Sequence, residues 1–100
     1  MSLGSEVCER VRELLNYYED TGVFTWKVSP RKGVPVGSLA GSYHGGSIKI
    51  WIDGEQYTAQ RLAWLYAHGE FPPCRVVHIG SKVDNALSNL RLIGENYESN

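Results

Sequence analysis

Basic side chains in the middle third of the sequence are the first candidates for chemistry. They lie in residues 24–50, which contain no acidic residue and carry a net charge of +4, whereas residues 1–23 carry −3 and the remainder carries −2. The four basic residues are Lys27, Arg31, Lys32 and Lys49. Because affinity for nucleic acid comes largely from neutralising phosphates, this segment is a candidate phosphate-facing surface. The alternative is that the chain has two solvated faces of opposite charge.

Trp51 is a candidate for contact with a partner. Residues 47–52 alternate, which places three isoleucines on one face and Trp51 beside Lys49 on the other. An exposed tryptophan beside a lysine favours contact with nucleic acid or with a protein. The candidate nucleic-acid-binding residues are therefore Lys27, Arg31, Lys32, Lys49, Trp51 and Arg61. The candidate protein-binding residues are Glu9, Glu13 and Trp51.

Structural roles are the simpler interpretation of the cysteines and of two histidines. Cys8 and Cys74 cannot form a disulfide framework or a zinc site by themselves, and both are expected to be buried thiols. His44, which precedes two glycines, is expected on a surface loop. His68 is expected near a helix C-terminus, where the helix dipole favours it. Trp26 and Trp64 are expected in the core.

These residues need elements to position them. Helical spacing of apolar residues predicts a first helix that Ser5 caps and that runs to Tyr18, before turn residues at 20–22. A second helix is predicted over 61–68 and ends at Gly69. Residues from Glu95 onward are expected to begin a third helix.

The strands complete an α+β fold. Strands are predicted over 23–28, 47–52, 74–79 and 90–93, with a short one near 38–40 in an otherwise irregular segment. Asp53-Gly54 predicts a tight hairpin. We expect an N-terminal helix, a small antiparallel sheet, a middle helix and a C-terminal strand–loop–strand–helix unit.

The order of these segments resembles that of the small phage and prophage HNH endonucleases along almost the whole chain. The matching segments are Asp20–Lys27, Ile50–Gly54, Tyr57, Arg61–Leu65, His68–Pro73, Val77–Ile79, Asp84-Asn85 and Ser88–Leu92. The resemblance implies a ββα-metal active site in the last quarter. In that site an Asp-His pair on the first strand supplies a metal ligand and a general base for activating water. An asparagine positions the histidine loop, and the final helix completes the metal site.

Only part of this machinery has a counterpart here. His78 corresponds to the general base and Asn89 to the positioning asparagine. Val77 stands where the family has the metal-binding aspartate, and it offers no oxygen to Mg²⁺. Direct counting puts Glu98 at the ligand position of the final helix, and Asn96 corresponds only if two residues are missing. There are three other departures from the family pattern. The loop after His78 is one residue short, and Gln60 replaces a histidine. The helix of the motif stops at Asn100, so we expect a truncated motif.

We therefore expect a degenerate HNH-type protein that acts by binding, with no cofactor and no metal ligands. A host or defence-system protein is the slightly favoured partner, by analogy with phage proteins that block host functions, because the net charge of −1 argues against a strong hold on DNA. Weak, non-specific binding of duplex DNA is the other expected mode. The alternative function is an active, Mg²⁺-dependent DNA-nicking endonuclease.

Length and composition set the outer bounds. One hundred residues and 11.2 kDa predict one domain over 1–100, in which 1–73 hold the first two helices and the sheet and 74–100 hold the ββα-like motif. No apolar stretch is long enough to cross a bilayer, and the N-terminus shows no signal peptide. The expected location is the cytoplasm of a bacterial host cell.

Overall fold

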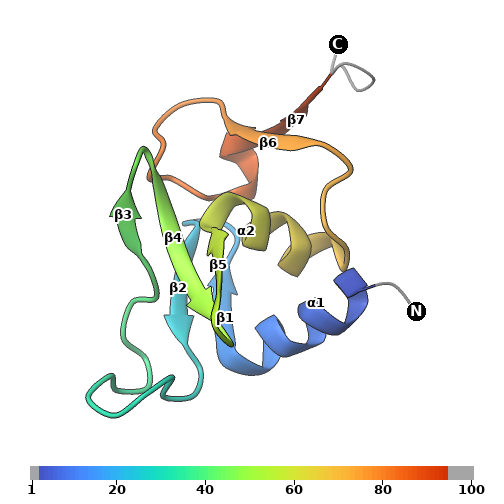
Figure 1. Cartoon of the computed structure of the whole chain (residues 1–100). Helices are drawn as coiled ribbons and strands as arrows, with labels where there is room; N and C mark the ends of the chain where they lie inside the picture. Colours follow the sequence, from blue (N-terminus) through green and yellow to red (C-terminus); the bar gives the residue numbers. More distant parts are fainter. Residues whose placement is uncertain (1–2, 95–100) are drawn as a thin grey trace.

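The computed structural model describes residues 3–94, with side chains from residue 6 onward. This part of the chain forms two α-helices, one short 3-10 helix and three small antiparallel sheets, which confirms the α+β class (Figure 1). The helices are α1 (Leu3–Leu14), α2 (Ala59–His68) and η1 (Leu87–Asn89). The strands are β1 (Leu15–Tyr18), β2 (Val23–Trp26), β3 (Ser42–His44), β4 (Ser47–Ile52), β5 (Glu55–Thr58), β6 (Arg75–His78) and β7 (Leu90–Ile93).

The first helix is shorter at its C-terminal end than the apolar spacing predicted. It begins at Leu3, so Ser5 lies within its first turn and does not precede it as a cap. Residues 15–18 are strand β1, which pairs antiparallel with β2, so the prediction of helix through Tyr18 is wrong. Apolar residues at helical spacing do not exclude a strand, and pairing with β2 satisfies these backbone groups while Leu15 becomes fully buried.

Strand β2 is bonded along both edges. One edge pairs with β1 and the other with the segment near 38–40, where Ala40 donates a backbone hydrogen bond to Phe24 and Thr25 forms an isolated bridge with Leu39. The predicted short strand is therefore a bridge, and β2 ends at Trp26, two residues earlier than expected. The long loop after β2 lies below the sheets in the view of Figure 1.

The predicted hairpin after residue 52 is confirmed. Asp53 and Gly54 both have positive φ, at 51° and 84°, which is the geometry of the two-residue turn that joins twisted strands. β4 pairs with β5 through this turn and with β3 on its other edge. Strand β3 was not predicted, and His44 at its end is exposed, as expected for a surface residue.

Helix α2 lies at the centre of the fold, between α1 and the β6–β7 hairpin (Figure 1). Its residues Leu62, Ala63 and Leu65 are fully buried, and its end is confirmed at Gly69, whose left-handed backbone (φ 83°) donates to the Leu65 carbonyl. The Cys8 thiol donates to the same carbonyl from α1. Other buried core residues are Val11, Leu15, Phe24, Trp26, Ile50, Ile52, Val76, Leu90 and Leu92.

Strands β6 and β7 correspond to the two strands expected in the C-terminal motif. β6 ends at His78, and β7 covers Leu90–Ile93 as predicted. The two strands pair antiparallel, with His78 opposite Leu90. The helix expected from Glu95, including the Asn96 and Glu98 positions, lies outside the described residues.

Candidate functional site

His78 sits at the end of β6 with its ring held by a buried amide. Its Nε2 lies 2.8 Å from Oδ1 of Asn85, a residue that is only 1% exposed. This contact uses Nε2 and leaves Nδ1 as the ring nitrogen outside it. One nitrogen of this imidazole is thus committed to a structural bond.

Asn85 also anchors the loop after β6 to the β1–β2 hairpin. Its backbone carbonyl accepts a hydrogen bond from the Tyr17 hydroxyl, and the Leu87 backbone N–H donates to the Glu19 carbonyl nearby. The turn before β2 packs closely against the backbone of this loop, because a Cβ added at Gly22 would lie 2.1 Å from the Ala86 backbone nitrogen. The His78 ring is therefore positioned by contacts that reach the N-terminal half of the chain.

Asn89 closes the same loop from the other side. Its Oδ1 accepts from the Gly80 backbone N–H at 2.8 Å, and its Nδ2 donates to the carbonyls of Ser81 and Asp84 at 2.9 and 2.7 Å. One amide thus bridges three backbone groups of the loop that follows His78. This is the kind of contact that the resemblance implies for the asparagine at this position.

The hydrogen bond from the Tyr17 hydroxyl to the Asn85 carbonyl should be sensitive to alkali. Burial raises the pKa of the Tyr17 phenol above its usual value of 10.0, and the negative charges of Glu19 and Asp84 raise it further. The unfolded chain then releases this proton at lower pH than the native chain. The stabilisation is fully present below about pH 10 and is lost as pH rises above that value.

We expect Tyr17→Phe to remove part of this alkaline dependence. The free energy of unfolding, measured by urea titration from about pH 8 to about pH 11, should fall less steeply in the variant than in the parent protein. Tyr43→Phe is the control, because Tyr43 is 57% exposed. A parent and a Tyr17→Phe variant with parallel pH profiles would contradict the role of this phenol.

The residue at the position where the resemblance implies a metal-binding aspartate does not fit a magnesium ion. Val77 is half-buried and has no oxygen, and one nitrogen of the neighbouring His78 is bound to Asn85. Nowhere in the described part of the chain do three or more His, Cys, Asp or Glu side chains gather as a candidate metal-binding group. We derive no reaction step through a metal from this site.

Three of the predicted nucleic-acid-binding residues come together in one groove. Arg31, Lys49 and Trp51 line a hollow of about 350 Å³ between the long loop after β2 and the outward face of β4. A second hollow, of about 460 Å³, adjoins it and shares Arg31 and Trp51. Trp51 is 60% exposed, as the alternation of β4 predicted. We call the two hollows together the Trp51 groove.

The other predicted basic residues lie apart from the hollows. The Lys27 ammonium donates at 2.7 Å to the Arg12 carbonyl at the end of α1, where it caps the helix. Lys32 is exposed on the loop after β2 but lines neither hollow. Arg61 stacks on the Phe71 ring at 4.8 Å and lines a different cavity.

The candidate protein-binding carboxylates lie on α1. Glu9 is exposed. Glu13 is also exposed, and its carboxylate lies 3.6 Å from the Arg10 guanidinium. Arg10 in turn binds Asp53 at the β4–β5 turn, with N–O distances of 2.9 and 3.2 Å. Part of the acidic surface is therefore compensated within the protein.

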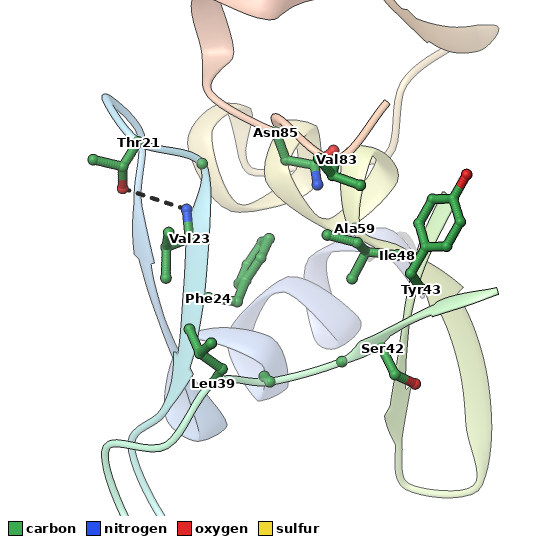
Figure 2. Close-up of a pocket in the computed structure, with 13 residues that line it drawn as sticks. Thr21, Val23, Phe24, Leu39, Ser42, Tyr43, Ile48, Ala59, Val83 and Asn85 are labelled. Atoms are coloured by element: carbon green, nitrogen blue, oxygen red, sulfur yellow. Dashed lines mark hydrogen bonds between the residues drawn. The ribbon is translucent and has the colours of Figure 1, made fainter. Parts of the chain in front are cut away.

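A small cavity next to Asn85 was not predicted from the sequence. It measures about 260 Å³ and lies between β2, the segment 39–43 and the loop after β6. Figure 2 shows the Asn85 side-chain nitrogen directed toward this space, which Phe24 and Ala59 also line. The Asp84-Asn85 pair was visible as part of the family resemblance, but nothing in its spacing indicated contacts with Tyr17 or a cavity.

Fold and site together define a small α+β protein. Its β6–β7 hairpin carries His78 at the end of the first strand, and the Trp51 groove carries aromatic and basic side chains. Comparison with protein-family models, curated proteins and solved structures finds no match to this chain. None of the helices formed within residues 3–94 combines the length and the apolar character that a membrane span requires.

Proposed function

We propose that this protein binds nucleic acid without hydrolysing it. The observation that carries the proposal is the Trp51 groove, in which an exposed indole lies beside two cationic side chains, Arg31 and Lys49. Cations that meet phosphates and an aromatic ring that meets a base are the two elements of a nucleic-acid-binding surface. The His78 hairpin then serves as a structural unit of an HNH-like fold.

The absence of hydrolysis is inferred from the side chains of the β6–β7 hairpin that could bind a metal ion. Without an oxygen ligand at Val77, phosphodiester cleavage by the family's route lacks the group that would hold the charge-stabilising cation. The bond between His78 and Asn85 does not count against catalysis, because a histidine base uses one ring nitrogen while the other is held by an orienting partner. Binding, in contrast, needs only an intact fold and the groove.

A protein of the host or of a defence system is the second candidate partner. The exposed carboxylates Glu9 and Glu13 on α1 and the net charge of −1 favour a basic protein surface over a polyanion. The ion pairs of Arg10 with Glu13 and Asp53 weaken this alternative, since they compensate part of that negative charge. Nucleic acid is therefore the first candidate.

We expect purified protein to leave supercoiled plasmid intact in the presence of Mg²⁺ or Mn²⁺. Gel electrophoresis of the plasmid over several hours checks this, with His78→Ala as the matched control for contaminating nucleases. Nicking by the parent that disappears in His78→Ala would overturn the proposal and favour the endonuclease alternative.

Val77→Asp is the informative companion variant. Nicking by this variant alone would assign the loss of activity to the missing carboxylate and show that the rest of the site is competent. An inactive Val77→Asp variant would show that departures elsewhere in the site also matter.

A further inference from the structure

The lining of the Trp51 groove contains an exposed aromatic side chain among polar residues. Its two hollows share Trp26, Pro30, Arg31 and Trp51, so they form one continuous depression over the outward face of β4. Trp51 is 60% exposed, whereas Trp26 is 7% exposed and forms part of the core beneath. The depression therefore presents one large aromatic surface to solvent beside a proline on the facing loop.

The charge of the groove is positive. No acidic side chain lines the hollow that contains Arg31 and Lys49. The adjoining hollow contains Asp53, but the Arg10 guanidinium binds this carboxylate and lowers its pKa, so their charges compensate each other. The Lys49 ammonium donates to the Ser47 hydroxyl at 2.8 Å and keeps two further N–H donors. Arg31 and Lys49 are thus available to anionic groups.

The exposed indole distinguishes between forms of nucleic acid. In a duplex the faces of the bases are covered by their neighbours, so a tryptophan on the protein surface meets sugars and phosphates. In a single strand the bases are free to stack on an aromatic side chain, and this contact depends little on sequence. Two cations are also few for a duplex, whose binding by proteins relies on many phosphate contacts.

We propose that the Trp51 groove binds single-stranded nucleic acid, with a base stacked on Trp51 and neighbouring phosphates at Arg31 and Lys49. This assignment rests on the proposed function and names its substrate class. Both DNA and RNA strands carry the bases and phosphates that the groove meets, so the two are separated by experiment.

Fluorescence anisotropy with labelled decathymidylate, decauridylate and a short DNA duplex tests the assignment. At low salt, the full chain should bind at least one single strand more tightly than the duplex. The logarithm of the binding constant should fall with the logarithm of salt concentration with a slope of about −1.4, as expected for two phosphate contacts on a single strand. The ratio between the two single strands shows which sugar is preferred.

Matched variants locate the binding surface. Trp51→Ala should weaken single-strand binding by about 10- to 100-fold, whereas Trp51→Phe should stay within a few-fold of the parent. Arg31→Gln and Lys49→Gln should each weaken binding and reduce the salt slope. Arg91→Gln on β7 is the control, since it removes the same charge outside the groove. Far-ultraviolet circular dichroism confirms that each variant is folded.

The outcomes separate the assignment from the proposed function. If the protein binds the duplex as tightly as the single strands, or if Trp51→Ala binds them normally, the single-strand assignment is wrong while nucleic-acid binding stands. If the parent protein binds neither form at low salt, both fail, and the protein-partner alternative becomes the leading one.

Discussion

Gly22→Ala is expected to be strongly destabilising although it adds only one methyl group. The backbone at Gly22 is left-handed (φ 78°), and an added Cβ would lie 2.1 Å from the Ala86 nitrogen and 2.3 Å from the Asn85 carbonyl carbon. These neighbours are backbone atoms, which cannot rotate away. The left-handed strain and the overpacking together should cost about 2 to 5 kcal/mol.

A loss of this size is a large fraction of the total stability of a small domain. The midpoint of thermal unfolding should fall by about 10 °C or more in circular dichroism or calorimetry. The loop that carries Asn85 should also separate from the β1–β2 hairpin, so the imidazole resonances of His78 should shift in NMR spectra.

Gly54→Ala provides the matched control for backbone strain. Gly54 has a similar left-handed φ of 84°, but nothing lies within 4 Å of the position that its Cβ would occupy. It should therefore lose only about 1 to 2 kcal/mol, from conformation alone. Equal losses in the two variants would show that the close approach of Gly22 to residues 85–86 is not present in solution.

Asn89→Ala is expected to release the loop between β6 and β7. The substitution removes hydrogen bonds to Gly80, Ser81 and Asp84 at once. With about 1 kcal/mol for each bond, the free energy of unfolding should fall by about 2 to 3 kcal/mol. Amide hydrogen exchange should locate the change, because the Gly80 N–H loses its acceptor and should exchange faster relative to core amides of α2.

Asn16→Ala is the control for removing an asparagine. The Asn16 amide makes one long hydrogen bond, at 3.4 Å, to the Thr25 hydroxyl between neighbouring strands. Its loss should cost about 0.5 kcal/mol or less. If Asn89→Ala proved as mild as Asn16→Ala, with unchanged exchange at Gly80, the three-bond clamp would be refuted.

Local pattern accounts for the elements that were predicted well. The alternation of residues 47–52, the Asp53-Gly54 turn and the glycine after His68 each specify their own geometry through period, positive φ or helix capping. The exposure of Trp51 follows from the same alternation. The limits of β7 also agree with the sequence, because its buried and exposed residues alternate.

The local sequence pattern gave wrong predictions where pairing with a distant strand determined the secondary structure. Leu15 and Tyr18 continue a helical spacing, yet these residues form β1 because β2 offers backbone partners and a buried site for Leu15. Strand β3 lies in a glycine-rich segment and exists through pairing with β4. A residue's own propensity is small compared with the gain from such pairing and burial.

The sequence by itself determined the fold class, the C-terminal end of the middle helix, the limits of β4 and β7, the acid-free basic segment and the exposed indole. It also determined that Val77 offers no oxygen beside His78. Tertiary structure alone decided that Arg31, Lys49 and Trp51 share a groove while Lys27 and Arg61 serve other contacts. It alone placed Asn85 between His78 and Tyr17. Periodicity and turn chemistry act over a few residues, whereas these contacts join residues separated by up to 68 positions, and only packing of the whole chain brings them together.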